Sequence, residues 1–162
     1  MRPHQVWMCA LGVWCAAQAA CAAAAEVTVV NKGFPGRNSR QALALLEREV
    51  LPFKPQHAVV FFGMNDAMNS GNLVPLAEFE QNLETLAARL AAGGVRTVAL
   101  VTIHPVIEAY VKERHPKHPQ RADMQAWLAA YDQAVRRVAQ ARKLGLIDWR
   151  SRVEKQGGAS VS

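Results

Sequence analysis

Short, continuous apolar runs alternate along this chain with longer segments of helical period, and this alternation constrains the fold more than any other feature. The apolar runs are Val27–Val30, Ala58–Phe62, Val95–Ile103 and Leu146–Ile147. A strand that is apolar at every position is typical of a parallel sheet whose two faces are both covered by helices. The alternation therefore predicts an α/β fold with three layers, α/β/α, around a parallel sheet.

The helices expected between these strands are indicated by apolar residues that repeat at three and four positions. The first has Asn38 or Ser39 as its cap and ends before Pro52. The clearest one ends at Gly93-Gly94, which is a typical stop signal. A short helix is compatible with Val106–Val111. The apolar faces of the three longer helices are Leu43, Leu46 and Val50; Leu76, Phe79, Leu83, Leu86 and Leu90; and Met124, Trp127, Leu128, Tyr131, Val135 and Val138.

The N-terminal segment has the layout of a secretory signal peptide. Met1–Arg2 is a short positive start, Val6–Ala25 is almost entirely apolar, and the segment ends in a run of alanines. We therefore expect cleavage near Ala25, which separates the leader 1–25 from a single domain 26–162. The mature protein would be secreted or periplasmic, with no stable membrane association. An uncleaved anchor is the alternative, because about 20 apolar residues can just span a bilayer.

Composition excludes several kinds of site. All three cysteines lie in the leader, so the mature chain has neither a disulfide framework nor a thiolate metal site. The net charge of +6 is concentrated at Lys112–Arg121 and Arg136–Lys143, but no aromatic residues suited to base stacking are interleaved there. Nucleic acid is therefore not an expected partner.

The histidines offer no recognisable metal site. His115 and His118, taken with Glu108 or His104, fit none of the standard ligand spacings. We expect these two histidines to lie in an exposed, proline-flanked loop, and we expect no bound metal.

Two segments that follow predicted strands could carry chemistry. Asn31–Ser39 contains glycines, which let backbone N–H groups approach a ligand closely. Gly63–Asp66 follows the next strand and could hold the amide of Asn65 rigidly. Ligands of parallel sheets bind beyond the carboxyl ends of the strands, where both segments fall. A backbone N–H and an asparagine amide that converge on one point form an oxyanion hole, which stabilises negative charge developing on a carbonyl oxygen.

Together these segments resemble the SGNH or GDSL-type hydrolases. The second block of that family looks like Asn31–Ser39, with Gly36 at the position that supplies an oxyanion N–H. The third block reads Gly-x-Asn-Asp, and Asn65 matches the asparagine that completes the hole. The resemblance runs from about Val27 to Trp149 and implies the SGNH hydrolase fold, with a flavodoxin-like parallel sheet. The residues expected to support the hole are Asp66, Asn38 and His104.

The resemblance also implies a reaction. A serine in a Gly-Asp-Ser block attacks an ester carbonyl, and the histidine of an Asp-x-x-His pair transfers the proton to the leaving alcohol while the aspartate orients it. No metal or organic cofactor is required. The expected substrate is a small-molecule or carbohydrate ester, with an acyl or acetyl group as the part removed. The oligomeric state is left open.

The sequence contains neither Gly-Asp-Ser nor Asp-x-x-His. The closest match, Asp148–Ser151, has serine where histidine is required, and Ser39 is better explained as a helix cap. In a serine protease, loss of the nucleophile or base lowers turnover by about 10⁶, whereas the oxyanion hole and binding retain roughly 10³–10⁴ over water. We therefore expect an inactive chain, truncated relative to the family, with the fold incomplete at both ends.

Two other functions are compatible with parts of the pattern. A non-catalytic pseudoenzyme could use the same crevice to bind carbohydrates or esters. A nucleotide-binding domain could use Gly33–Gly36 as a phosphate loop. The second is disfavoured because neither G-x-G-x-x-G nor G-x-x-x-x-G-K-[ST] occurs and because the second strand ends in Gly63 rather than in an acidic residue.

Overall fold

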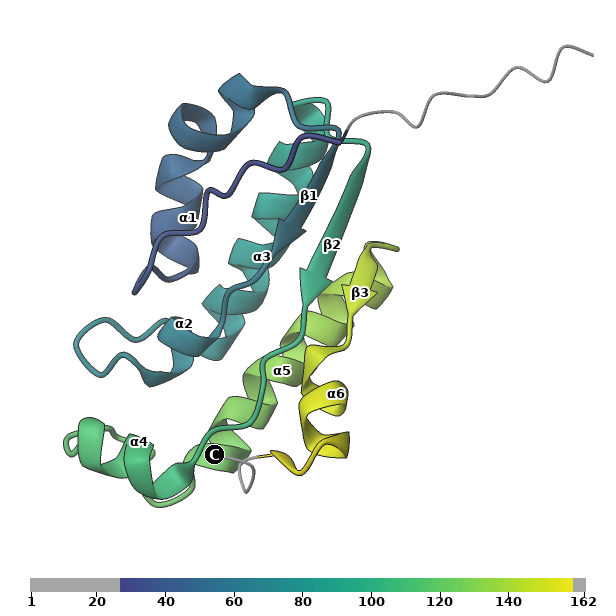
Figure 1. The fold of residues 1–162 in the computed structure, drawn as a ribbon. Coiled ribbons are helices and arrows are strands. Elements are labelled where there is room, and N and C mark those ends of the chain that lie inside the picture. Colours follow the sequence, from purple (N-terminus) through teal and green to yellow (C-terminus); the bar gives the residue numbers. More distant parts are fainter. Residues whose placement is uncertain (1–26, 159–162) are drawn as a thin grey trace, which may run out of the picture. The chain divides into compact units, whose positions relative to one another are not determined.

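The computed structural model describes residues 27–158, and at its centre lies a parallel sheet of three strands (Figure 1). The strands are β1 (His57–Val60), β2 (Thr97–Val101) and β3 (Gly145–Ile147), and β2 lies between the other two. The sheet and all of its helices belong to the second of two compact units, Lys32–Ser162. The predicted α/β class with a parallel sheet is confirmed.

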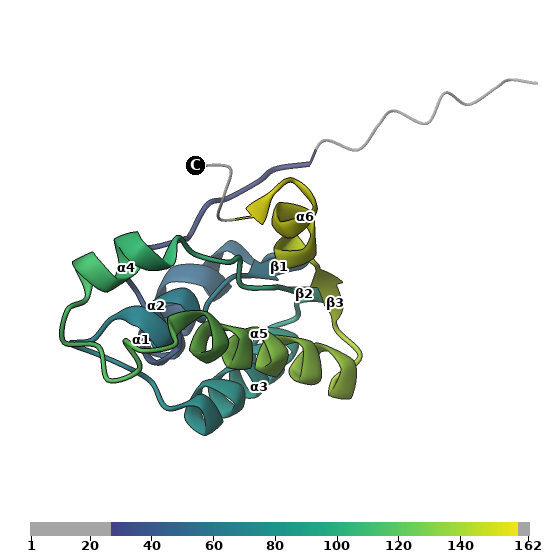
Figure 2. The same cartoon turned by 90° about the horizontal axis from the view of Figure 1, so that it is seen from below.

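The helices form layers on the two sides of this sheet. They are α1 (Ser39–Leu45), which continues as a π-helical turn (Leu46–Val50) and a 3-10 turn (Leu51–Phe53), α2 (Met64–Met68), α3 (Leu76–Ala92), α4 (Glu108–Arg114), α5 (Met124–Ala141) and α6 (Trp149–Lys155). Figure 2 shows α3 and α5 together on one face and α6 on the other. Because α3 and α5 each connect two neighbouring strands, they place the carboxyl ends of all three strands at one edge.

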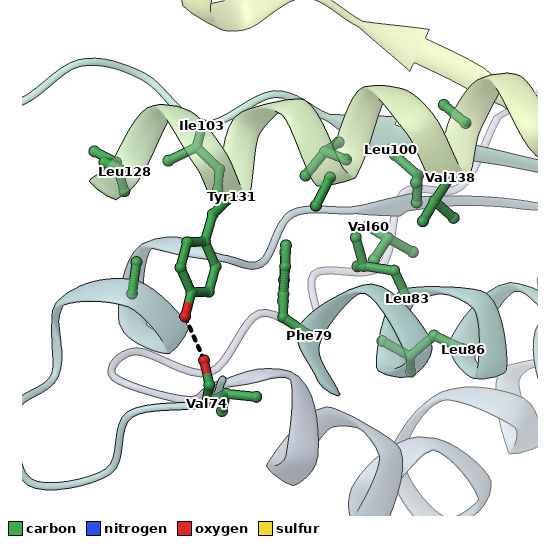
Figure 3. Packing of buried hydrophobic residues seen from close by; sticks show 14 of the residues in the cluster. Val60, Val74, Phe79, Leu83, Leu86, Leu100, Ile103, Leu128, Tyr131 and Val138 are labelled. Atoms are coloured by element: carbon green, nitrogen blue, oxygen red, sulfur yellow. Dashed lines mark hydrogen bonds between the residues drawn. The ribbon is translucent and has the colours of Figure 1, made fainter. Parts of the chain in front are cut away.

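The core fills the space between the sheet and the pair α3 and α5. Alternate strand residues, among them Val60 and Leu100, point into it and are buried. Figure 3 shows Tyr131 crossing this space, where its hydroxyl donates a hydrogen bond to the Val74 carbonyl at 2.5 Å. Burial raises the pKa of Tyr131 to about 12. Most of the helix positions predicted from periodicity are buried: Leu46, Phe79, Leu83, Leu86, Leu90, Met124, Leu128, Tyr131, Val135 and Val138. The other predicted positions are partly buried and pack against this core: Leu43, Val50, Leu76 and Trp127.

The opposite face of the sheet is covered only in part. Val59 is 66% exposed, and Phe61 and Ile147 are 47% and 43% exposed. The continuous apolar runs had predicted helices over both faces. On this face the seven-residue α6 follows directly after β3, and it leaves Val59 and Phe61 exposed.

One predicted strand is wrong and two helices were not predicted. Val27–Val30 has no regular secondary structure and is not a strand of the described sheet, and Val27 and Val29 are more than 80% exposed. An apolar run becomes a strand only where a neighbouring strand accepts its backbone hydrogen bonds. The helices α2 and α6 escaped prediction because seven residues or fewer cannot display a clear helical period. The predicted leader lies outside the described residues.

Candidate active site

The loop before α1 contains a tight turn centred on Pro35-Gly36. The Arg37 N–H donates a hydrogen bond to the Phe34 carbonyl at 3.4 Å, and Gly36 has φ +75°. This left-handed conformation strains any residue with a Cβ, and glycine adopts it freely. A Cβ at Gly36 would meet no heavy atom within 4 Å. The glycine is therefore required by the backbone conformation of the turn and not by lack of space.

Asn65 lies in the first turn of α2 and is held against this loop. Its Nδ2 atom donates a hydrogen bond to the Arg37 carbonyl at 3.0 Å. An amide nitrogen carries two hydrogens, so this bond orients the side chain and leaves a second N–H for a ligand. Gly36 and Asn65 line the same groove. The two residues predicted to form an oxyanion hole are thus brought together by the fold.

Asp66 joins the two segments that carry Gly36 and Asn65. One carboxylate oxygen accepts the backbone N–H of Ser39 at 2.9 Å, and the other accepts that of Gly63 at 3.1 Å. The side chain is fully buried, and this burial raises its pKa, while the hydrogen bonds from Ser39 and Gly63 act in the opposite direction. The carboxyl therefore fixes the start of α1 relative to the end of β1.

Gly63 makes the sharp change of direction between β1 and α2. Its φ of +116° lies in the region reserved for glycine, and a Cβ there would come within 2.2 Å of Ile103 Cδ1 and 3.0 Å of Phe79 Cζ. Gly63 is therefore required both by its backbone and by the core around it. The turn brings Asn65 and Asp66 to the edge of the sheet directly after the strand.

The start of α1 is capped by Asn38 and not by Ser39. The Asn38 Oδ1 atom accepts the N–H of Gln41 at 3.1 Å, and the Gln41 Oε1 atom accepts the N–H of Asn38 at 3.1 Å. Asn38 Nδ2 also donates to the Asn72 carbonyl. Ser39 is fully buried, and its hydroxyl accepts a hydrogen bond from Asn82 at 2.9 Å. The Ser39 hydroxyl is thus part of the support under the loop and has no access to the groove.

The groove beside the two candidate oxyanion residues has a volume of about 430 Å³. Its lining combines α2 and the loop after it with α4, a helix that follows β2. The lining residues are Gly36, Met64, Asn65, Met68, Asn69, Tyr110, Val111, Arg114 and His115. Burial, followed by the nearby Arg114 and His118, lowers the pKa of His115. The sequence is compatible with a short helix at Val106–Val111, but it carries no local signal that Tyr110, Val111 and Arg114 lie beside Asn65, because that proximity depends on the tertiary fold.

Neither of the other two histidines considered from the sequence lines this groove. His104 bonds through Nδ1 to the Pro105 carbonyl at 2.8 Å, and its ring centre lies 6.4 Å from that of Phe61. The expectation that His118 is exposed is wrong, because its side chain is buried and bonds through Nε2 to the Ala67 carbonyl at 2.8 Å. Across residues 27–158, no three His, Cys, Asp or Glu side chains gather into a group that could hold a metal ion.

A charged cluster of Arg136, Asp132 and Asp148 lies at the end of β3. Arg136 donates two hydrogen bonds to the Asp148 carboxylate, at 2.9 and 2.6 Å, and a third to Asp132 at 2.9 Å. The Arg136 guanidinium holds the pKa of Asp148 well below its usual range. Asp148 also accepts the N–H of Ser151 and caps α6. Its hydrogen bonds thus assign Asp148 to the support of α6.

Comparison with known proteins identifies relatives over most of this chain. Residues 5–162 match the sequence model of the GDSL-like Lipase/Acylhydrolase family. The chain is 24% identical to an uncharacterized lipoprotein of Bacillus subtilis over 84% of its length, and 30% identical to an isoamyl acetate-hydrolyzing esterase 1 homolog of Bos taurus over 80%. A lipase/acylhydrolase from Enterococcus faecalis superposes with a TM-score of 0.65 at 30% identity over 83%. The chain spans 60%, 56% and 63% of these three relatives.

Proposed function

Because this chain belongs to the GDSL-like lipase/acylhydrolase family, we propose that Gly36 and Asn65 form the oxyanion hole of a carboxyl-ester hydrolase. The observation that carries the proposal is the bond from Asn65 to the Arg37 carbonyl, which holds the amide beside the Gly36 turn. The buried Asp66 supports it further, since its carboxyl fixes the backbone on both sides.

The chemistry of this site follows from where charge develops. When a nucleophile adds to an ester carbonyl, the carbonyl oxygen becomes negative, and the remaining Asn65 N–H and the Gly36 N–H would donate hydrogen bonds to it. Donors that are fixed in advance stabilise this charge without reorganising, and removal of one such donor typically lowers turnover about 10²–10³-fold. Arg37 and Asp66 are positioning residues in this scheme, because they act through Asn65 and the loop.

The chain contains neither the Gly-Asp-Ser block nor the Asp-x-x-His pair of the serine mechanism. We therefore propose that the 162-residue chain by itself has no measurable esterase activity. An oxyanion hole without a nucleophile and base retains only a small part of the rate enhancement of such enzymes.

The proposed substrate is an ester with a short acyl group, as in the Bos taurus relative named for isoamyl acetate hydrolysis. Met64, Met68 and Val111 give part of the groove an apolar lining that suits a short aliphatic chain. The proposed location is outside the cytoplasm, supported by the leader-like residues 1–25 and by the lipoprotein relative of Bacillus subtilis. Over residues 27–158, no helix has the length and hydropathy needed to cross a bilayer.

The test has a catalytic arm and a binding arm. With the chain present, p-nitrophenyl acetate should hydrolyse no faster than it does in buffer alone. Titration with millimolar ethyl butyrate should shift the ¹H–¹⁵N signals of Gly36 and the Asn65 side chain. The variant Asn65→Ala should lose the ester-induced shift at Gly36, while the control Gln81→Ala, an exposed position on α3 outside the described groove lining, keeps it. Saturable turnover that Asn65→Ala abolishes would refute the proposed inactivity, and unchanged signals in the unsubstituted chain would refute the oxyanion assignment.

A further inference from the structure

We propose that the groove selects esters that carry a carboxylate on the part away from the reacting carbonyl, and that Arg114 recognises this charge. The inference rests on the proposed function, because it takes the Gly36 and Asn65 side of the groove as the place of the ester carbonyl. It adds a substrate class and a specificity-determining residue.

Arg114 is the last residue of α4, and its guanidinium is oriented by its own helix. Its Nη1 atom donates a hydrogen bond to the hydroxyl of Tyr110, one helical turn earlier, at 3.2 Å. No carboxylate of the described residues lies within ion-pair distance of Arg114, whereas Arg40, Arg136 and Arg137 each pair with an acidic side chain. A guanidinium has five N–H donors in a fixed plane. One bond to Tyr110 thus sets its direction and leaves donors for a ligand.

The rest of the lining leaves this positive charge uncompensated. Of the described residues around the groove, none is acidic. His115 stands next to Arg114, and its lowered pKa favours the neutral ring at neutral pH. Arg114 is therefore the one fixed charge in the described lining, and a bound anion would meet no negative side chain there.

The apolar part of the lining sets the form of the ligand. Met64, Met68 and Val111 belong to the same groove as Asn65 and Arg114. An aliphatic spacer can lie against these side chains and remove apolar surface from water. The hydrogen bonds from a guanidinium to a carboxylate are charge-assisted and can be bidentate. The groove therefore suits a short-chain ester with an ester group at one end and a free carboxylate at the other.

Two matched esters test this inference. Monomethyl glutarate carries the carboxylate, and dimethyl glutarate is its neutral counterpart of nearly the same shape. Binding to the full chain is measured by ¹H–¹⁵N titration at pH 7.5 and low ionic strength. We expect monomethyl glutarate to bind roughly three- to fivefold more tightly, which is the range of a partly exposed ion pair. This preference should disappear at 0.5 M NaCl because salt screens exposed charges.

Variants separate Arg114 from the overall positive charge. Arg114→Gln should lower the affinity for monomethyl glutarate to that for dimethyl glutarate, and Arg114→Lys should keep part of the preference, since lysine retains the charge but loses the planar donors. Arg152→Gln removes an equal charge from α6, outside the described groove lining, and should change neither affinity.

Each other outcome overturns a definite statement. Equal binding of the two esters, still lost in Asn65→Ala, overturns the charge preference and leaves the proposed function standing. A preference that persists in Arg114→Gln overturns the assignment to Arg114. Failure of both esters to bind the unsubstituted chain overturns the proposed function, and the inference falls with it.

Discussion

The carboxyl ends of β1 and β3 each place an aspartate at a helix start, but the two aspartates are held by different interactions. At the first, Asp66 is buried and accepts two neutral backbone N–H groups. At the other, Asp148 is half-exposed and pairs with the guanidinium of Arg136. Burial raises the pKa of the Asp66 carboxyl, while Arg136 lowers that of Asp148.

The difference shows two ways of using a carboxylate at a strand end. Backbone N–H groups around Asp66 have no freedom to rotate, so their bonds fix the course of the chain where Gly36 and Asn65 meet. The pair between Asp148 and Arg136 joins two side chains and holds α5 against α6. We expect substitutions at the β1 end to be strongly destabilising, because its geometry is set by buried groups. We expect substitutions at the β3 end to be less destabilising, because water can replace the hydrogen-bond partners of the half-exposed Asp148.

The largest loss of stability is expected from Gly63→Ala at the β1 end. The added Cβ would overlap Ile103 and occupy a strained backbone conformation. Overpacking and strain together should lower the free energy of unfolding by about 4 kcal/mol. Gly36→Ala is the matched control, because it carries the backbone strain without the overlap and should cost about 1 kcal/mol. Urea unfolding followed by circular dichroism measures both, and equal losses would contradict the packing role of Gly63.

Asp66→Ala should come next, with a loss of about 3 kcal/mol. The substitution leaves the N–H groups of Ser39 and Gly63 buried without an acceptor, and each unsatisfied group costs about 1–3 kcal/mol. The corresponding change at the β3 end, Asp148→Ala, removes a helix cap and an exposed ion pair and should cost about 1 kcal/mol. A larger loss for Asp148→Ala in the same unfolding measurement would reverse the comparison.

Arg136→Gln tests how far Asp132, the buried carboxylate of the cluster at the end of β3, depends on its cation. Asp132 is 1% exposed, and its carboxylate would keep the Ile103 N–H but lose its cation. Because Arg136 itself is partly exposed, we expect about 2 kcal/mol, less than for a fully buried pair. The control Arg137→Gln breaks an exposed pair with Glu80 and should cost at most about 0.5 kcal/mol. Thermal unfolding of both variants measures the difference between their losses of stability. Equal losses would show that the buried Asp132 does not need the Arg136 cation.

The smallest effect is expected in the pH dependence of stability, where the two aspartates act in opposite directions. The pKa of Asp148 is lowered in the folded state, so its contribution is present above the unfolded pKa of about 3.9 and is lost as pH falls through the folded pKa. The pKa of Asp66 is raised, so its contribution is greatest below the unfolded pKa and decreases as pH rises through the folded pKa.

The measurement is urea unfolding between pH 2.5 and 7. Asp148→Asn should flatten the loss of stability below about pH 4, because the side chain that takes up the proton is gone. Asp66→Asn should remove the decrease in the free energy of unfolding that the unsubstituted chain shows above about pH 4. Identical pH profiles for the two variants would show that the opposite pKa shifts do not control stability.

Much of the fold could be predicted from the sequence, for local reasons. The apolar periods of α3 and α5 and their end signals lie within each segment, and both helices appear where the pattern indicates. Gly36 and Asn65 were recognisable because each belongs to a short motif at a strand end. The error at Val27–Val30 arose because a strand depends on a partner, and an apolar run contains no information about whether one is present.

The amino-acid sequence by itself determined the alternation of strands and helices, the family resemblance and the two candidate oxyanion residues. Only the tertiary structure decided that Asp66 bonds to a backbone N–H 27 residues earlier and that α4 brings Arg114 to the groove of Gly36 and Asn65. The physical reason is that periodicity and capping act over a few residues. Burial and hydrogen-bond partnership depend instead on which distant segments the sheet places side by side.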